Sequence, residues 1–230
     1  MITKNQIKFL KSLYLKKNRN KYQKVIIEGY RLIEESIKGG ADIEHIYFSD
    51  DSYNKYKNNK FLKINSYDII CNKDFNKVSD TKNSQGIIAL VNIKKYYNSN
   101  KSNISSNIVV LDGIQDPGNL GTICRTCVWY GITTIVLTNN CINPFNSKCI
   151  RSGMGAHFYL ENIIETTSKE IIEFCKDNNY SILVADIIGQ NIRDISINNK
   201  WALVLGSEAH GTSDFFSQYK KITIKKFGDL

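Results

Sequence analysis

Short apolar runs alternate with helical spacings of apolar residues along the whole chain. The N-terminal part begins with a predicted lysine-rich helix, whose apolar face carries Ile7, Leu10, Leu13 and Tyr14. The pattern then predicts strands at residues 25–29, 43–48 and 87–91 and a helix at residues 31–38, with a polar loop or exposed helix at 50–59. These elements form a small α/β unit.

The C-terminal part alternates more regularly between strand and helix. Predicted strands cover residues 108–111, 134–137, 181–185, 201–205 and 222–224. Predicted helices cover residues 120–130 and 168–178, and a further helix surrounds Lys148. Strands that alternate with helices indicate a mostly parallel sheet with helices on both faces, and therefore an α/β fold.

Residues 96–106 separate these two parts. The stretch YYNSNKSNISS is rich in Asn and Ser and has no apolar period, which is typical of a linker. We therefore expect an N-terminal domain at residues 1–95, a linker at 96–106 and a C-terminal domain at 107–230.

The formal charge of +9 comes entirely from the N-terminal part. Residues 1–95 contain 19 Lys and Arg against 10 Asp and Glu, whereas residues 96–230 contain 12 of each kind. A basic module joined to a neutral one favours a polyanion such as nucleic acid as partner. A composition rich in Lys, Asn and Ile also arises from genome bias, so charge alone leaves both interpretations open.

The sequence pattern predicts neither a membrane-spanning helix nor a secretory signal. The sequence contains no apolar run long enough for a transmembrane helix, and its N-terminal residues lack the apolar core of a secretory signal. The six cysteines are therefore expected to be reduced thiols. We expect a cytoplasmic or organellar protein.

The most informative motif runs from Asp112 to Arg125, with the sequence DGIQDPGNLGTICR. A strand is predicted to end at Asp112, a turn to form at Pro117-Gly118, and Asn119 to cap the helix that follows. Helix N-termini at the carboxyl edge of a parallel sheet bind anions and polar ligands. Arg125 lies on an otherwise apolar stretch of this helix, which is unusual. Three interpretations stay open: a ligand contact, a surface arginine, or a structural ion pair with Asp112 or Asp116.

A second motif runs from Trp201 to Gly211, with the sequence WALVLGSEAHG. An apolar strand leads directly into Gly206, and a glycine at a strand end allows a ligand to approach the backbone. The alternative is a tight turn in which Ser207 or Glu208 caps a helix. We expect the nearby His210 to be a solvated turn residue.

Other patterns carry less weight. Cys124 and Cys127 form a C-x-x-C inside the predicted helix, which favours buried thiols over a zinc or redox site. The sequence GSEA at residues 206–209 lacks the second glycine of a nucleophile elbow. The sequence GMGAHF at residues 153–158 lacks the third glycine of a dinucleotide fingerprint, and the sequence contains no P-loop motif.

Together these motifs resemble the SpoU/TrmH family of RNA ribose methyltransferases, in the SPOUT superfamily. The residues that match the family's first motif are Asn119, Gly121 and Arg125, and those that match the second are Gly206, Glu208 and Gly211. Residues 151–158 look like the family's segment around a Met-Gly-Ala. Residues 26–32 resemble part of the substrate-binding domain that precedes the catalytic domain in many members.

The resemblance implies an L30e-like RNA substrate-binding domain followed by a SPOUT methyltransferase domain with an α/β trefoil knot. In this family, a third motif has an Ile, a Gly four residues later, and then a Ser-Leu-Asn that opens a final helix. Ile224 and Gly228 begin that motif here, and the sequence given ends at Leu230. We therefore expect the knot to be incomplete in this chain, and a homodimer to form when the C-terminal tail is present.

The resemblance also implies methyl transfer from S-adenosyl-L-methionine to a ribose 2′-hydroxyl, without a metal. Arg125 would meet the 2′-oxygen or an RNA phosphate. Because a guanidinium has no acceptor atom, stabilising the developing alkoxide or clamping the phosphate suits it better than base catalysis. Asn119 would orient Arg125 or the ribose, and Glu208 would hold its loop or take part in proton transfer. The residues expected to hold the cofactor are Leu205, Gly206, Gly211, Ile224 and Gly228.

Ribosomal RNA is the expected substrate, because this two-domain arrangement resembles members that modify ribosomal RNA; transfer RNA is the alternative. The N-terminal lysines would contact RNA phosphates. Tyr14, Tyr22 and Tyr30 would either stack on unpaired bases or belong to the core. Two rival functions stay open: a non-catalytic RNA-binding protein derived from this family, and an unrelated nucleotide-binding α/β enzyme. Cofactor binding separates the first rival from the methyltransferase.

Overall fold

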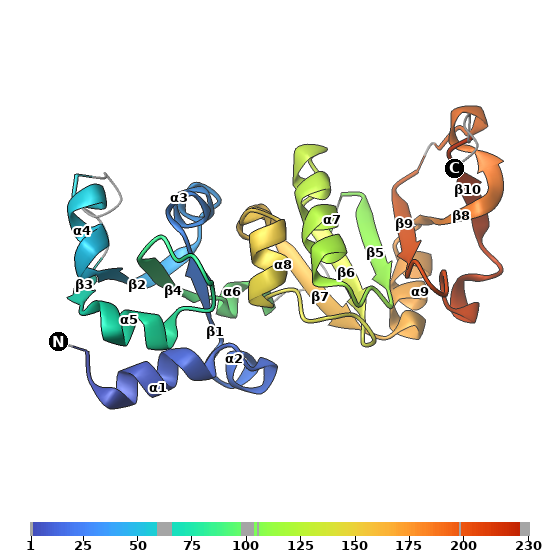
Figure 1. The fold of residues 1–230 in the computed structure, drawn as a ribbon. Coiled ribbons are helices and arrows are strands. Elements are labelled where there is room, and N and C mark those ends of the chain that lie inside the picture. The colour runs from blue at the N-terminus through green and yellow to red at the C-terminus, as the bar shows by residue number, and fades with distance from the viewer. Residues whose placement is uncertain (1, 59–65, 98–103, 105, 198, 226–230) are drawn as a thin grey trace. The chain divides into compact units, whose positions relative to one another are not determined.

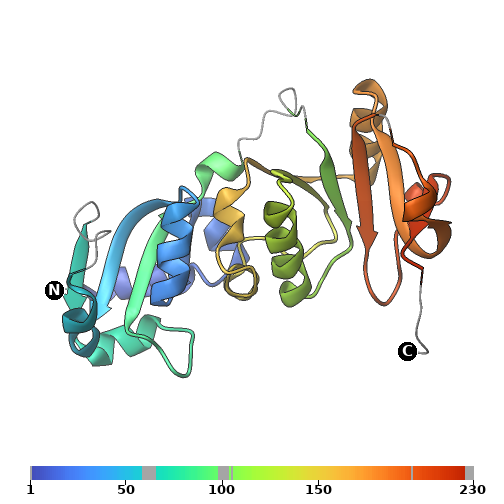
Figure 2. The same ribbon diagram turned by 90° about the horizontal axis from the view of Figure 1, so that it is seen from above.

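The computed structural model describes residues 2–58, 66–97, 104, 106–197 and 199–225. The chain divides into two compact units. Unit 1 comprises residues 1–98, 117–125 and 143–159, and unit 2 comprises residues 99–116, 126–142 and 160–230. Each unit is built on one sheet, and Figures 1 and 2 show the two sheets from two sides.

The sheet of unit 1 has four strands in the order β1-β4-β2-β3. The strands are β1 (Lys24–Glu28), β2 (Asp42–Ser49), β3 (Tyr67–Ile70) and β4 (Ile87–Asn92). β4 is antiparallel to β1 and β2, whereas β2 and β3 are parallel. The N-terminal helices are α1 (Lys4–Ser12), α2 (Lys16–Tyr22), α3 (Tyr30–Lys38), α4 (Asp50–Tyr56), α5 (Asn72–Val78) and α6 (Lys94–Tyr97).

The apolar face of the predicted N-terminal helix forms part of the core of unit 1. Leu10 and Leu13 are each 1% exposed and pack in one cluster with Ile26 and Ile88. Tyr14 packs against this cluster, and its buried hydroxyl has no hydrogen-bond partner among the described residues. Burial raises the pKa of Tyr14. Tyr14 is therefore a core residue and is not available to stack on a base.

The other two tyrosines considered for base stacking have aromatic neighbours within unit 1. Tyr30 stacks on Tyr56, with ring centroids 4.9 Å apart. Tyr22 is 39% exposed and contacts Phe9 edge-on at 5.1 Å. Of the three tyrosines, only Tyr22 is exposed; Tyr14 and Tyr30 are partly buried.

Two later segments of the chain also belong to unit 1. They contain the start of α7 (Pro117–Trp129), the helix α8 (Ser147–Ser152) and the short 3-10 helix η3 (Ala156–Tyr159). The buried Arg19 ties α2 to the second of these segments. Its guanidinium donates to the carbonyls of Leu13 and Tyr14 at 3.1 and 2.7 Å, and to Asn143 Oδ1 at 3.1 and 3.0 Å. An arginine that looks like part of a basic surface is thus a structural residue.

The beginning of the expected linker is helical, because α6 extends to Tyr97. Tyr96 is 2% exposed, and its ring lies 5.6 Å from Phe145 and 5.9 Å from Phe158. Its hydroxyl donates to the carbonyl of Phe158 at 3.3 Å. Residues 98–103 and 105 of the expected linker lie outside the described residues. The domain boundaries at residues 95 and 107 stay a prediction.

The sheet of unit 2 has six strands in the order β10-β8-β9-β5-β6-β7, and every neighbouring pair is parallel. The strands are β5 (Ile108–Asp112), β6 (Thr134–Thr138), β7 (Asn162–Thr166), β8 (Ser181–Asn191), β9 (Trp201–Gly206) and β10 (Lys220–Thr223). This arrangement confirms the predicted parallel sheet and the α/β class. β7 was not predicted, and β8 extends further than residues 181–185.

The core of unit 2 lies between this sheet and α9 (Ser168–Asp177). The unit also contains two short 3-10 helices, η4 (Ile192–Asp194) and η5 (Asp214–Phe216), and Phe216 of η5 is part of the core. All five residues of β5 are buried. Val110 packs with Val204, Ile171, Cys175 and Phe216 in a single cluster. α9 begins with a capping box, in which Thr167 and Glu170 each accept a backbone N–H of the other. No helix in the described part of the chain is long and apolar enough to cross a membrane.

Candidate active site

Asp112 of the first motif and Gly206 of the second lie at neighbouring strand ends. β5 and β9 are paired in parallel, with Asp112 opposite Gly206. The carboxyl ends of parallel strands are where α/β proteins bind ligands. At this edge of unit 2 lies a cavity of about 450 Å³, which Asp112, Gly113, Gln115, Asn140, Ser207, His210, Gly211, Thr212 and Ser213 line. Its size falls in the range of small-molecule sites, roughly 300–1,000 Å³.

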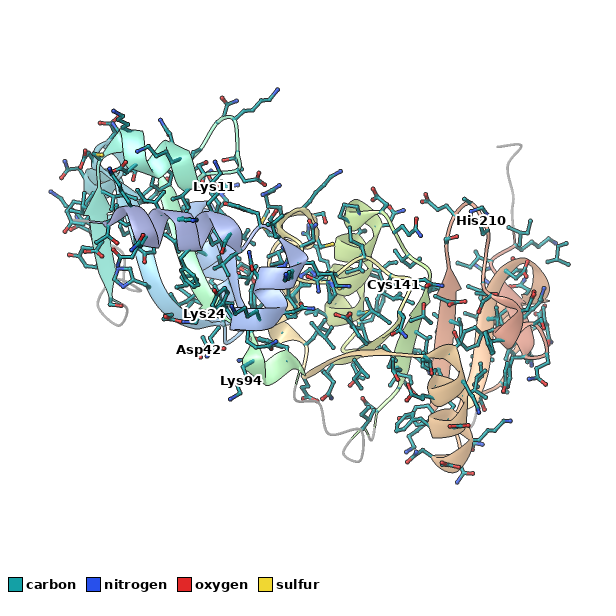
Figure 3. All side chains as sticks on the ribbon, turned by 90° about the horizontal axis from the view of Figure 1, so that it is seen from below. Lys11, Lys24, Asp42, Lys94, Cys141 and His210 are labelled. Atoms are coloured by element: carbon teal, nitrogen blue, oxygen red, sulfur yellow. The ribbon has the colours of Figure 1, made fainter. Side chains whose placement is uncertain are left out.

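The loop after β9 is closed on itself. Ser207 and Gly211 exchange two backbone hydrogen bonds of 3.0 and 2.8 Å, and the N–H of His210 donates to Ser207 Oγ at 3.1 Å. Gly211 has a φ of 68°, a conformation that favours glycine. Figure 3 labels His210 on this loop and Cys141 in the turn after β6. His210 is exposed, as expected, but it also lines the cavity.

Gly206 has a packing role that its sequence context did not suggest. A side chain at this position would overlap the backbone of Gly211 and Thr212. The chain's own loop therefore occupies the space that the missing side chain leaves. The expected contact between Gly206 and a cofactor stays a prediction.

Other backbone at this edge is open. At Gly113 and Gly211, both with positive φ, a Cβ atom would meet nothing within 4 Å. Asp112, which is 5% exposed, accepts the N–H of Ser213 at 2.6 Å, and the N–H of Gly113 donates to Thr138 Oγ1 at 3.1 Å. Open backbone beside hydroxyl and amide side chains fits a polar ligand with a nucleoside part, such as S-adenosylmethionine. Sequence patterns missed Asp112 and Ser213 as a pair, because only the β5–β9 pairing brings them together.

The remaining expected cofactor residues occupy different places in unit 2. Leu205 and Gly206 are half-buried at the end of β9, and Gly211 lies in the exposed loop. Ile224 follows β10 and is 83% exposed. Gly228 lies outside the described residues, as does the end of the expected knot. Glu208 is exposed in the loop after β9.

The first motif lies on α7, whose first part belongs to unit 1. The helix begins at Pro117, so the prediction that Asn119 caps it was wrong. Proline suits the first helical position because its φ is preset and the missing N–H would have had no partner within the helix. Asn119 is half-buried in the first turn, and Arg125 is exposed. Among the described residues of unit 1, Arg125 has no hydrogen bond or ion pair, so its charge is available to a ligand.

Gly121 explains why the first motif contains a glycine. A side chain there would overlap the Cys149 carbonyl and the Ser152 hydroxyl, and would lie 2.7 Å from the N of Gly153. The Ser152 hydroxyl donates to the carbonyls of Pro117 and Cys149 at 3.1 and 3.0 Å. The first turns of α7 therefore pack backbone to backbone against α8.

The C-x-x-C pair on α7 consists of buried thiols, as predicted. Cys124 and Cys127 are 0% and 5% exposed. Burial raises the pKa of Cys127 to about 11, so its thiol is protonated and unreactive near neutral pH. In the described part of the chain, no group of three or more His, Cys, Asp and Glu side chains could hold a metal ion.

The Glu35 carboxylate on α3 connects this helix to η3, and the charge of Arg125 acts on it electrostatically. The Tyr159 hydroxyl donates to Glu35 Oε1 at 2.6 Å. This hydrogen bond, with smaller contributions from Lys38 and the Arg125 guanidinium, holds the pKa of Glu35 below its usual value. The Glu35–Tyr159 contact joins residues 124 positions apart, so no local pattern could reveal it.

The two sets of predicted catalytic residues thus belong to different units. Asn119 and Arg125 lie in unit 1, whereas Glu208 and the cavity at the β5–β9 edge lie in unit 2. Within unit 2, the structure brings Gly206, Glu208 and Gly211 onto one strand end and its closed loop.

Comparison with known families gives two matches. Residues 106–229 match the SpoU rRNA Methylase family, and residues 4–89 match the MRM3-like substrate binding domain. The first match includes both motifs described above and covers more than half of the chain.

Two relatives illustrate the range of the family. The chain is 28% identical to the 23S rRNA (guanosine(2553)-2′-O)-methyltransferase RlmP of Bacillus subtilis over 209 residues, which cover 90% of this chain and 82% of the relative. It is 32% identical to the human mitochondrial rRNA methyltransferase 3 over 182 residues. That alignment covers 74% of this chain but only 42% of the human protein.

Solved structures show the same fold. A TrmH-family protein from Porphyromonas gingivalis aligns with a TM-score of 0.85 at 25% identity, over 99% of this chain and 90% of that one. An AdoMet-bound rRNA methyltransferase from Sinorhizobium meliloti aligns with a TM-score of 0.80 at 21% identity, over 99% of this chain and 88% of that one.

Proposed function

Because the chain belongs to the SpoU rRNA methylase family, we propose that it transfers a methyl group from S-adenosyl-L-methionine to a ribose 2′-hydroxyl of ribosomal RNA. The observation that carries this proposal is the family match over residues 106–229, which contains Arg125 on α7 and the closed loop after β9. The Bacillus and human relatives are named as rRNA methyltransferases, which supports ribosomal RNA over transfer RNA.

S-adenosylmethionine supplies an activated methyl group when bound. We assign its binding to Leu205, Gly206, Gly211, Ile224 and Gly228. The open backbone at Gly211 supports this assignment. That the Sinorhizobium protein of the same fold is AdoMet-bound supports S-adenosylmethionine as the cofactor.

Arg125 acts on the ribose or on its phosphate. Its guanidinium is exposed and carries no partner among the described residues of unit 1, and a guanidinium offers only hydrogen-bond donors. It therefore stabilises negative charge that develops on the 2′-oxygen, or holds the adjacent phosphate so that the hydroxyl is aligned for transfer. Asn119, six residues earlier on the same helix, orients Arg125 or the ribose. Glu208 shapes the loop after β9 or accepts the proton of the hydroxyl.

The N-terminal domain, which we place at residues 1–95, holds the RNA mainly through phosphates. Lys16 and Lys17 are exposed on α2. Lys24 forms an ion pair with Glu44 at 2.5 Å. Replacing Lys16 and Lys17 by Gln should reduce the salt dependence of RNA binding, because each lost phosphate contact lowers the slope by about 1. Lys24→Gln serves as the control with a smaller expected effect, and an unchanged slope in the double variant would place the RNA surface elsewhere.

The same resemblance predicts a homodimer when the C-terminal tail is present, and we further propose a cytoplasmic or organellar location. Light scattering on the purified protein tests the dimer directly. The Bacillus relative and the human mitochondrial relative support either compartment.

The test is methyl transfer from tritiated S-adenosylmethionine to purified ribosomal and transfer RNA. We expect label in ribosomal RNA with the wild-type protein, and a loss of roughly 10²–10³-fold in Arg125→Ala, as for the removal of one transition-state donor. Calorimetric titration with S-adenosylmethionine should give the same affinity for both proteins. RNA binding without cofactor binding or transfer would favour the non-catalytic alternative, and label in transfer RNA alone would change the substrate.

A further inference from the structure

Unit 1 contains a second cavity, of about 300 Å³, away from the β5–β9 edge. It lies where β1 ends, where α3 begins, and where α8 turns into η3. The side chains that give it its chemistry are those of Glu28, Arg31, Asn83, Gln85, Arg151 and Met154. None of these residues has a part in the proposed methyl transfer.

Two of the chain's five arginines line this cavity. Arg31 is exposed, and among the described residues it has no hydrogen-bond or ion-pair partner. Arg151 has one, Asp80, with a long separation of 3.6 Å between Nη1 and Oδ2. A guanidinium can donate two parallel hydrogen bonds to one phosphate group. Because a guanidinium is only weakly hydrated, the desolvation cost of placing it against the phosphate is low.

The carboxylates near these arginines are already engaged. Glu28 is 8% exposed, and its oxygens accept the hydroxyls of Ser79 and Thr81, both at 2.6 Å, and the N–H of Asp80 at 3.1 Å. Glu28 therefore holds the loop that follows α5 and has little acceptor capacity left for a ligand. Among the described residues, Asp80 is the carboxylate that pairs with Arg151, and its distance of 3.6 Å is too long for a strong pair.

Two amide side chains supply donors and acceptors at the same cavity. The N–H of Tyr30 donates to Gln85 Oε1 at 2.7 Å. This bond fixes the orientation of the amide and leaves its NH₂ group as a donor. Asn83 is exposed and has no partner among the described residues. Amides in such positions recognise the polar edge of a nucleobase, and Met154, 41% exposed, adds an apolar surface.

The cavity is linked to Arg125 through α3. Arg31 is the second residue of this helix, and Glu35, whose pKa the Arg125 guanidinium lowers slightly, lies four residues later. Residues four apart on a helix are neighbours on one face, roughly 5–6 Å apart. Arg31 and Glu35 therefore share one face of α3, and the cavity and Arg125 belong to the same unit. One RNA strand can thus contact Arg125 and place a neighbouring nucleotide in the cavity.

We propose that this cavity binds an unpaired nucleotide of the substrate RNA that is close in sequence to the methylated one. Arg31 and Arg151 hold its phosphate, and the amides of Asn83 and Gln85 contact the edge of its base. The site would thereby select the RNA segment that is presented to Arg125. This inference rests on the proposed function, since it assumes RNA as the substrate. A free mononucleotide has the same chemistry and is separated from RNA by the test.

The test compares Arg31→Gln with Arg193→Gln, an arginine on η4 outside the cavity. RNA binding is measured by fluorescence anisotropy with a ribosomal RNA fragment that the wild-type protein methylates, at several salt concentrations. Arg31→Gln should weaken binding about 10-fold and lower the salt slope by about 1, with KM raised more than kcat is lowered. Arg193→Gln should bind as the wild type does. Because Arg31 is exposed and without partners in unit 1, its replacement should leave the melting temperature unchanged.

Two further measurements keep the outcome unambiguous. Titration with guanosine 5′-monophosphate detects a free-nucleotide site: binding that Arg31→Gln abolishes, with RNA affinity unchanged, would overturn the assignment to RNA. Equal RNA affinity and salt slope in Arg31→Gln and wild type would also overturn it, while methyl transfer by both proteins would leave the proposed function intact. A wild-type protein that methylates no RNA would instead contradict the proposed function itself.

Discussion

His157 makes the stability of unit 1 depend on pH. Its side chain is 0% exposed on η3, beside the ring of Phe145 at 6.1 Å. Neither ring nitrogen has a well-formed hydrogen bond to a described residue. Burial lowers the pKa of His157 from 6.5 to about 4, although the nearby Pro144 carbonyl favours the proton. The folded protein therefore holds this imidazole in its neutral form.

The sign and size of the effect follow from proton linkage. Between pH 6.5 and about 4, the unfolded chain binds a proton at His157 that the folded chain does not. The free energy of unfolding is therefore highest above pH 6.5 and falls as the pH drops toward 4. The displacement of the pKa corresponds to a loss of about 3 kcal/mol once the pH reaches 4, at about 1.4 kcal/mol per pH unit.

Urea unfolding between pH 4.5 and 8 measures this loss. At pH 5 we expect wild type to have lost about 2 kcal/mol through His157 relative to pH 8. In His157→Gln the side chain no longer titrates, so the decrease should be smaller by that amount, whatever the absolute stability of the variant. His210→Gln, at an exposed histidine, should keep the wild-type slope. Identical pH slopes for wild type and His157→Gln would refute the reasoning.

Three further substitutions test the packing described above. Gly121→Ala gains about 1 kcal/mol in helix propensity but overlaps the Cys149 carbonyl, so we expect a net loss of about 2 kcal/mol in thermal unfolding; a more stable variant would contradict the α7–α8 contact. Arg19→Met removes the donor to Asn143 Oδ1 and to the Leu13 and Tyr14 carbonyls, and urea unfolding should show a loss of about 3 kcal/mol. Gly206→Ala should accelerate hydrogen exchange in the loop after β9, and unchanged exchange would show that the loop tolerates a side chain there.

The sequence predicts helices and strands well where the segment is a continuous apolar run. β5 and β9 are apolar runs that end in a polar or glycine residue, and the structure confirms both strands. β3 and β7 were not predicted, because Asp68 and Glu165 interrupt the apolar pattern in strands of four and five residues. The sequence pattern places the start of α7 too late, because Asn119 is a good capping residue, whereas the helix begins at Pro117, a residue that suits the first helical position.

The candidate site was predictable only in part. The glycines and charged residues of the two motifs were identified as sequence neighbours, and the family match confirms the resemblance that they suggested. The roles of Arg125, Asn119 and Glu208 stay predictions. The cavity at the β5–β9 edge depends on Asp112 and Ser213, which are 101 residues apart. The buried Arg19 was out of reach for the same reason, since Asn143 lies 124 residues away.

Nucleoside analysis of the methylated RNA tests the central claim most directly. Ribosomal RNA is incubated with the protein and S-adenosylmethionine, digested to nucleosides, and examined by mass spectrometry. The account predicts a nucleoside with the added methyl group on the ribose, formed by the wild-type protein and lost in Arg125→Ala. A methyl group on the base, or ribose methylation that persists in Arg125→Ala, would contradict the assignment of Arg125 to the 2′-hydroxyl and its phosphate.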